Sequence, residues 1–409
     1  MKQIVFWGLA ILSVLCACQG GHPAEKAKQA ASVEHLREYT EAIAHDSCEG
    51  RRPFSAGADR AVGYIAEQMK AVGLKPIAGD SYFQEVPIIS SRTVCPEPMR
   101  LRTPKQTLSL EWLEGYTAFS ARIEPEITLA DAPLFFAGYG IVAPEYGKND
   151  YAGIAHPEEK VAVVIVNDPG LGSTDESVVY LGHWDHLGYG APIDGDSLIN
   201  GATDNAVAIA WMLEIARCFQ ALPESPRRNV VFLSPTCEET GFLGTKYYVE
   251  HPLFPVEKVA AVINLDVFPL WGENNDVTIT GYGNSNLDST LAVLAKPYGR
   301  YIMPDPDAYN GMFYRSDHFP FVQRGVPAMF AKGWNDNRKH GKEWSKEQIA
   351  KYWAETYHKP TDQTHPETDD YSGLLQEVHL FFDLGYTLSQ AEDFPRWNEK
   401  SEFARLLNR

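Results

Sequence analysis

The side chains that could do chemistry in this sequence are histidines and carboxylates that follow short apolar segments. They are His183 and Asp185 after residues 178–181, Glu238 and Glu239 after 230–233, Asp266 directly after the apolar residues of 259–265, Asp204 in a Gly-Ala-Thr-Asp-Asn segment where a helix starts, and His358 in a loop after a helix. Imidazole and carboxylate groups are the ligands of catalytic zinc sites. If the apolar segments are strands of one parallel sheet, these side chains converge on one edge, where the ligands of such sheets gather.

A pair of zinc ions accounts for the number of these side chains. Two zinc ions about 3.5–4 Å apart need one carboxylate to bridge them and two further ligands each. Two histidines and three carboxylates satisfy that need, and one carboxylate remains as the base that takes a proton from the attacking water. Because Glu238 and Glu239 are adjacent, we expect one to bind metal and its neighbour to face the water. Asp185, two residues after His183, is expected on the same side of a strand, accepting the other ring N–H.

Taken singly, each motif has an ordinary structural explanation. A lone histidine or a Glu-Glu pair is usually on the surface, and Asp204 alone would be interpreted as a helix N-cap. Asp266 fits such a role less well, because a carboxylate that ends an apolar strand is costly to bury without a partner. The ordered series at strand ends therefore favours a metal site.

The elements that must position these residues are buried strands alternating with helices. Apolar segments at 161–166, 178–181, 230–233, 259–265 and 326–330 are typical of strands buried on both faces. Apolar residues at helical spacing mark 209–216, 287–294 and 374–384. This alternation predicts an α/β fold with a mainly parallel mixed sheet covered by helices on both faces.

The first 160 residues have a different pattern of apolar residues from the rest of the chain. Apolar residues at helical spacing predict amphipathic helices around residues 33–43 and 62–72. Residues 82–160 are rich in Pro, Gly and short apolar runs, which predicts β structure and loops.

Composition limits the kinds of partner. The 409 residues are 44% hydrophobic and 22% charged, which is ordinary for a folded globular protein. The net charge of −18 argues against nucleic acid as a partner, because a phosphate binder needs a basic face. The cysteines beyond the amino terminus are Cys48, Cys95, Cys218 and Cys237, and the sequence does not choose among their three full pairings.

The amino terminus predicts export. One lysine precedes an apolar run from Ile4 to Leu15, which is the core of a signal peptide and too short to span a bilayer. Leu15-Cys16-Ala17-Cys18 resembles a bacterial lipobox with Cys18 as the lipid-bearing residue, and plain secretion is the alternative. We therefore expect a signal peptide over 1–17, a lipid-anchored tether over 18–31, and a periplasmic or cell-envelope protein, as an outer-membrane lipoprotein.

The motifs together resemble those of the family-28 zinc metallopeptidases, which include bacterial leucyl aminopeptidases and, as relatives, glutaminyl cyclases. The resembling segments are Cys-Glu-Gly-Arg-Arg-Pro at 48–53, Gly-His-Trp-Asp-His-Leu-Gly at 182–188, residues 201–205, Cys-Glu-Glu at 237–239, Asn-Leu-Asp at 264–266, Tyr-Arg-Ser-Asp-His at 314–318 and Tyr-His-Lys-Pro at 357–360. The resemblance extends over most of residues 33–390. It implies a zinc exopeptidase domain over 32–398 with two zinc ions per chain, acting as a metallo-aminopeptidase on peptides.

The resemblance also implies individual roles. His183 and Asp266 would bind one zinc ion, Glu239 and His358 would bind the other, Asp204 would bridge both, Glu238 would be the general base and Asp185 would orient His183. Arg315, Ser316 and Asp317 would line the substrate pocket or begin a structural helix. Tyr357 would donate a hydrogen bond to the developing oxyanion or pack.

The chain departs from the family pattern in several places. Residues 136–142 and 150–153 resemble the edges of a protease-associated insertion, so 82–160 is interpreted as its remnant. Cys237 stands where glycine is common, and Val267 follows Asp266 where relatives often have methionine. Substrate preference therefore cannot be carried over.

Three rival functions remain open at this point. A glutaminyl cyclase would form pyroglutamate with one zinc ion. A dipeptide-releasing or carboxy-end exopeptidase would use the same scaffold. A binding lipoprotein without turnover would be expected to lack a ligand or the base, and none is missing here.

Overall fold

The computed structural model describes residues 23–90, 95, 97–102, 104–116, 142–143, 148–149, 161–167 and 174–406. The predicted signal peptide, Cys18 and most of the predicted insertion edges lie outside the described residues. Two compact units are present: one comprises residues 1–86 and 161–409, and the other residues 87–160. Among the described residues, no helix combines the length and the apolar character that crossing a membrane requires.

The larger unit contains a nine-stranded sheet. Its strand order is β1-β7-β11-β8-β12-β15-β13-β14, and β2 also pairs with β7. The strands are β1 (Lys75–Pro76), β2 (Phe83–Val86), β7 (Val161–Asn167), β8 (Ser177–Leu181), β11 (Asn229–Ser234), β12 (Val259–Asn264), β13 (Asp276–Thr280), β14 (Tyr301–Pro304) and β15 (Ala328–Lys332). The neighbours β11, β8, β12 and β15 are parallel. Strand β7 runs antiparallel to β1, β2 and β11, and β13 runs antiparallel to β15 but parallel to β14.

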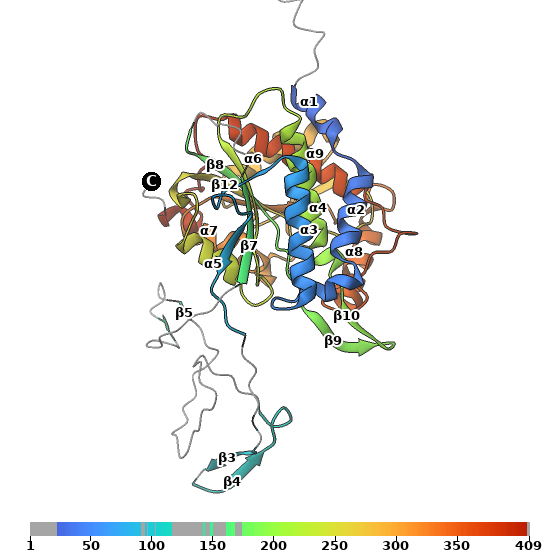
Figure 1. Ribbon diagram of the computed structural model, residues 1–409, viewed down its shortest axis with the longest axis vertical. Helices are drawn as coiled ribbons and strands as arrows, with labels where there is room; N and C mark the ends of the chain where they lie inside the picture. Colours follow the sequence, from blue (N-terminus) through green and yellow to red (C-terminus); the bar gives the residue numbers. More distant parts are fainter. Residues whose placement is uncertain are drawn as a thin grey trace, which may run out of the picture. The chain divides into compact units, whose positions relative to one another are not determined.

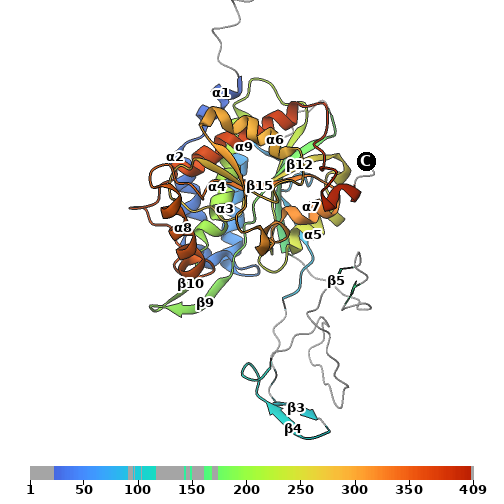
Figure 2. The same cartoon turned by 180° about the vertical axis from the view of Figure 1, so that it is seen from behind.

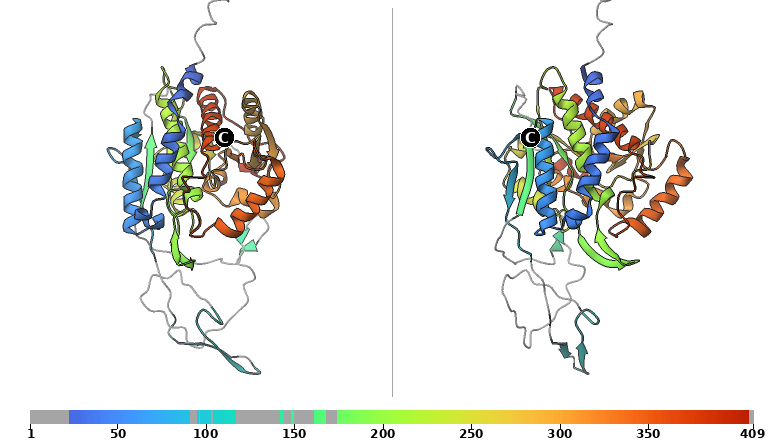
Figure 3. Two further views of the ribbon diagram at one scale, coloured as in Figure 1. Left: turned by 90° about the vertical axis from the view of Figure 1, so that its right-hand side faces the viewer. Right: turned by 45° about the vertical axis from the view of Figure 1, so that its right-hand side comes forward.

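Helices cover both faces of this sheet, as Figures 1 and 3 show. The helices are α2 (Val33–Ile43), α3 (Ala56–Val72), α4 (Val207–Gln220), α5 (Leu243–Glu250), α6 (Leu287–Ala295), α7 (His318–Gln323), α8 (Gly341–Lys351) and α9 (Ser372–Gln390). Helices α3, α4 and α9 lie on one face, and α5 and α7 on the other. The view from behind in Figure 2 shows β12 and β15 beside each other. The predicted α/β fold is confirmed.

Local sequence explains the helix limits. Ser32 and Ser55 accept hydrogen bonds from the amides of His35 and Ala58, which caps the starts of α2 and α3. Gly73 ends α3 at φ 97°, a conformation that glycine adopts without strain. Both predicted amino-terminal helices are therefore present.

The central strands are apolar because both of their faces are covered. Every residue of β8 and β12 is buried. On the side of α4, Tyr180 contacts Trp211 edge-on and stacks on Phe232. This aromatic packing fixes the strands whose carboxyl ends carry the candidate ligands.

The folded part begins before the predicted boundary at residue 32. Residues 23–30 form the short helices α1 (Pro23–Ala27) and η1 (Lys28–Ala30), where the sequence predicted a tether. Lys28 is buried, and its Nζ lies 2.9 Å from Asp383 Oδ2. Ala24 and Ala27 pack into the core, so the small residues taken for a tether fill space beside α4.

The smaller unit contains short hairpins. Strands β3 (Met99–Arg102) and β4 (Thr107–Leu110) pair antiparallel, as do β5 (Val142–Ala143) and β6 (Lys148–Asn149). The interpretation of 82–160 as a remnant of an insertion stays a prediction.

Cys48, Cys95, Cys218 and Cys237 are all free thiols.

Candidate metal centre

The ends of three neighbouring parallel strands deliver most of the candidate residues to one edge of the sheet. His183 lies two residues beyond β8, and Asp266 two residues beyond β12. Glu238 and Glu239 follow β11 after a short turn. Asp204 comes from η4 (Ala202–Ala206), which runs directly into α4.

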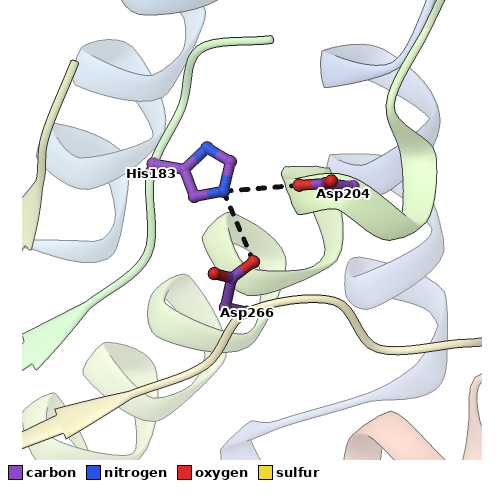
Figure 4. Close-up of side chains that lie close together, drawn as sticks. All are labelled: His183, Asp204 and Asp266. Atoms are coloured by element: carbon purple, nitrogen blue, oxygen red, sulfur yellow. Dashed lines mark ion pairs between the residues drawn. The ribbon is translucent and has the colours of Figure 1, made fainter. Parts of the chain in front are cut away.

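The first group of ligands surrounds His183, as Figure 4 shows. His183 Nε2 lies 3.4 Å from Asp204 Oδ1 and 3.4 Å from Asp266 Oδ1. All three residues are buried, and their ligand atoms lie within 4.8 Å of one another. Such a spacing suits donor atoms that share one cation.

The second group shares Asp204 with the first. His358 Nε2 lies 3.3 Å from Asp204 Oδ2 and 3.1 Å from Glu239 Oε2. The two carboxylate oxygens of Asp204 therefore face different histidines, each of which has one further carboxylate beside it. This is the arrangement that a bridging carboxylate needs.

His186 is a residue of this site that sequence reasoning missed. It is buried, and its Nδ1 lies 2.6 Å from Glu239 Oε1. It also belongs to a possible ligand group with Asp204 and Glu239. The available signal was the second histidine of the His-Trp-Asp-His segment at 183–186.

The donor set fits divalent cations. Nε2 of His183 and of His358 is buried and lacks a hydrogen-bond partner among the described residues, so each offers a lone pair to a metal. Burial lowers the pKa of His183, but Glu238, Asp204 and Asp266 together raise it well above its usual value. Burial raises the pKa of Asp204, but His183 and His358 bring it well below its usual range. These carboxylates require positive charge between them, which a metal ion supplies when it displaces the imidazole protons.

Glu238 has the environment of a general base. Its Oε2 lies 3.9 Å from His183 Nε2, and 9% of the residue is exposed. Burial raises the pKa of Glu238 well above its usual value against the opposing effect of His183, and the carboxylates of Asp266 and Asp317 add to the increase. A raised pKa brings a carboxylate closer to the proton affinity that proton transfer near neutral pH needs.

Asp185 contacts His183 differently from the prediction. No strand continues to Asp185, because β8 ends at Leu181. The main-chain oxygen of Asp185 lies 3.1 Å from His183 Nδ1, whereas its carboxylate Oδ1 is 3.8 Å away, beyond hydrogen-bond distance. Asp185 Oδ1 instead accepts a hydrogen bond of 3.2 Å from the amide of Glu238. The carboxylate therefore holds the base, and the carbonyl orients the ring.

Ser316 and Asp317 make structural hydrogen bonds, and the substrate-pocket role of the segment from Arg315 to Asp317 stays a prediction. Arg315 is exposed, while Ser316 Oγ accepts a hydrogen bond from Asn264 and Asp317 Oδ1 accepts one of 2.5 Å from Thr245. Asp317 precedes α7, as expected of a helix start. Burial raises the pKa of Asp317 to about 7. The carboxylate thus acts on the site through its charge rather than by direct contact.

Tyr357 packs against a ligand. Its ring stacks on His358 with centroids 3.8 Å apart, and Trp353 contacts it edge-on. Burial and the nearby carboxylates of Asp204 and Glu239 raise the pKa of its hydroxyl group. Both predicted roles, packing and hydrogen-bond donation, are compatible with this position.

Comparison with known proteins identifies the family. The model of Peptidase family M28 matches residues 163–379, which is just over half of the chain and includes every candidate ligand. The chain belongs to peptidase family M28. The predicted membership among the zinc metallopeptidases is confirmed.

Solved structures with the fold of this M28 chain have low sequence identity to it. The aminopeptidase from Aneurinibacillus sp. strain AM-1 is 16% identical, with a TM-score of 0.54 over 91% of this chain and 97% of that one. The glutaminyl cyclase of Bacteroides thetaiotaomicron is 14% identical, with a TM-score of 0.50 over 87% of this chain and 97% of that one. Leupeptin-inactivating enzyme 1 of Streptomyces exfoliatus is 30% identical over 135 residues, which are 32% of this chain and 29% of that enzyme. The fold alone therefore does not distinguish peptide hydrolysis from cyclisation.

Proposed function

We propose that this M28 protein is an exopeptidase that removes residues from the amino end of peptides and uses two zinc ions. The observation that supports two ions is the position of Asp204, whose two oxygens lie 3.4 Å and 3.3 Å from different histidines. His183 and Asp266 would hold one zinc ion, Glu239 and His358 the other, and Asp204 both. Bound zinc would polarise the scissile carbonyl and lower the pKa of a water molecule.

The protein's own residues would move the proton and steady the reacting groups. Glu238 would take the proton of the attacking water and deliver it to the leaving amine. Asp185 would keep Glu238 in place through the hydrogen bond to its amide. The raised pKa of Tyr357, which burial and nearby carboxylates cause, keeps its phenol protonated, as a donor to a developing oxyanion requires.

Metal removal and product identification test the proposal. The purified protein should release the first residue from short peptides, lose this activity in a chelator and regain it when zinc is added. Mass spectrometry of the products distinguishes release of one residue from release of a dipeptide or of the carboxy-terminal residue. Intact peptides after incubation of the zinc-loaded protein with a broad library would contradict the proposal and favour a binding protein.

Glutaminyl-peptide cyclisation is the second candidate, supported by the cyclase among the proteins with this fold. Metal analysis separates the two. About two zinc ions per chain would favour the peptidase and about one the cyclase. A product that is lighter than a glutaminyl peptide by one ammonia would decide for the cyclase.

We also propose that the protein is exported and anchored through lipid on Cys18, with peptides as its partners. The basis is the apolar segment before Leu15-Cys16-Ala17-Cys18. Labelled fatty acid should be incorporated into the wild type and not into a Cys18→Ser variant, and the wild type should fractionate with the envelope. Recovery of the wild type from the cytoplasm without label would contradict this.

A further inference from the structure

The turn that carries Asp204 is held by two buried charged residues that do not belong to the ligand set. Residues 200–204 form the turn between β10 (Asp196–Ile199) and α4. Arg51 binds the carbonyl groups of this turn, and Asp362 binds its amide groups. The two residues come from opposite ends of the sequence.

Arg51 is fully buried, and its guanidinium donates hydrogen bonds to main-chain oxygens. Its guanidinium donates hydrogen bonds of 2.8 Å to the oxygens of Gly201 and Trp184, and it also donates to the oxygens of Asn200 and Ile43. Trp184 lies between His183 and Asp185, so one side chain joins the turn of Asp204 to the segment of His183. A planar group with five donors is suited to several carbonyls at once.

Asp362 is a buried anion that accepts hydrogen bonds from the amide groups of the same turn. Its Oδ1 accepts from the amide of Thr203 at 3.0 Å and from the Thr203 hydroxyl, and its Oδ2 accepts from the amide of Asp204 at 3.1 Å. Its main-chain oxygen accepts from the amide of Ala202 at 3.2 Å. Asp362 lies only four residues after His358. The hydrogen bonds of Asp362 therefore also hold the loop that carries His358 against the turn of Asp204.

We infer that Arg51 and Asp362 are positioning residues that fix the bridging carboxylate of Asp204 between His183 and His358 before metal binds. Arg51 donates hydrogen bonds to the carbonyl groups of the turn, and Asp362 accepts hydrogen bonds from its amide groups. A rotation of the turn would leave one of these buried charges without hydrogen-bond partners, which is costly. A fixed turn lowers the cost of ordering ligands when the metal arrives, and loss of such supporting contacts typically weakens metal binding 10–100-fold. The inference rests on the proposed metal site and is independent of the substrate.

Zinc affinity is the measurement that tests this. Metal-free wild type, Arg51→Lys and Asp362→Asn would compete with a chromophoric chelator for zinc. Arg51→Lys keeps the positive charge but loses the planar set of donors. Asp362→Asn keeps the shape of the side chain but places its NH₂ group against an amide N–H, so that one hydrogen bond is lost. We expect zinc dissociation constants about 10–100 times larger in both variants. The absorption of bound Co²⁺ should also change, because the bridging oxygen atoms move.

The controls are matched residues nearby. Arg52→Lys alters the exposed neighbour of Arg51, and Asp369→Asn alters a carboxylate that accepts from the amide of His365 in the same region as Asp362. Both should bind zinc within twofold of the wild type. Thr203→Val removes the hydroxyl contact with Asp362 but keeps both charged residues and the amide contact, and it serves if a charge variant does not fold. Its affinity should fall severalfold.

Two outcomes are decisive. Unchanged zinc affinity and Co²⁺ absorption in folded Arg51→Lys, Asp362→Asn and Thr203→Val would overturn the inference. A wild type that binds zinc but releases no amino-terminal residue would contradict the proposed function while leaving the affinity comparison intact. The inference and the proposed function therefore fail separately.

Discussion

Glu238 and Glu239 are adjacent residues with opposite environments. Burial and neighbouring carboxylates raise the pKa of Glu238. Burial and Asp204 also act to raise the pKa of Glu239, but the adjacent His186 and His358 outweigh them and lower it. One carboxylate is thus suited to hold a proton and the other to bind a cation. Because the side chains of adjacent residues leave the backbone in different directions, Glu238 and Glu239 have different neighbours.

This difference predicts opposite effects of two isosteric substitutions. Glu238→Gln should lower kcat about 10²–10⁴-fold because the base is lost, with zinc content unchanged. Glu239→Gln should lower zinc content, because an amide binds the cation more weakly. Metal analysis beside peptide hydrolysis checks both. Full activity of Glu238→Gln would remove Glu238 from the mechanism.

His318 should make stability depend on pH. Burial lowers its pKa to about 4, whereas the unfolded chain has a value of about 6.5. Between these values the unfolded state binds more protons, so the free energy of unfolding falls as pH falls, by about 2 kcal/mol from pH 7 to pH 5. Urea unfolding of metal-free protein at both pH values should show a smaller acid-induced loss in His318→Gln than in the wild type.

Its neighbour Asp317 provides the control with the opposite sign. Burial raises the pKa of Asp317 to about 7, so the folded state binds more protons below that pH and stability rises as pH falls. Asp317→Asn should therefore lose more stability on acidification than the wild type does. Changes of the same sign in both variants would contradict this assignment.

The ligands were predictable from residue type, whereas their supporting contacts were not. An ordered series of histidines and carboxylates at strand ends favours a metal site, so His183 and Asp266 stand out as members of that series. The partners of Arg51, Asp362 and the Asp185 carboxylate are main-chain groups of distant turns. Every residue carries such groups, so no pattern of residue types marks them.

At the scale of elements, sharp turns bring the strand ends to the site. Cys237, Val267 and His358 have φ values of 55°, 55° and 57°, in the left-handed region that favours glycine. Glycine, which the family resemblance predicts at position 237, adopts this conformation without strain. A β-branched residue such as Val267 is strained there, and strain of this kind gathers at functional sites. Because none of the three is glycine, the sequence gives no signal of these turns.

Gly201 shows how little space the central turn allows. A Cβ atom at this position would clash with the main-chain oxygen of Asp204 and lie 2.5 Å from His186 Cδ2. Gly201→Ala should therefore displace Asp204 and abolish tight zinc binding. Gly299→Ala is the matched control, because Gly299 has a similar φ of 69° and nothing within 4 Å of such an atom. It should cost about 1–2 kcal/mol of stability in urea unfolding and leave zinc affinity unchanged. Tight zinc binding by Gly201→Ala would contradict this.

At the scale of the whole molecule, the smaller unit is inserted between two paired strands. Residues 87–160 follow β2 directly and precede β7. Val86 and Val161 are partners in the antiparallel register of these strands. The chain therefore leaves and re-enters the sheet at neighbouring positions. The apolar segment that begins at residue 161 indicated this boundary from sequence. The pairing of β2 with β7 has no local sequence signal, because it joins segments about 75 residues apart.

This pairing predicts that the larger unit folds without the smaller one. Replacing residues 87–160 by Asn-Gly would join Val86 to Val161 through a two-residue hairpin turn that suits antiparallel strands. The shortened protein should unfold cooperatively and bind zinc with unchanged affinity, because every candidate ligand lies in the larger unit. Joining Glu85 to Val161 through the same turn is the control, since a shift of one residue turns side chains to the opposite face and should destabilise the sheet. Loss of zinc binding in an in-register deletion that still unfolds cooperatively would contradict this and show that the metal site depends on residues 87–160.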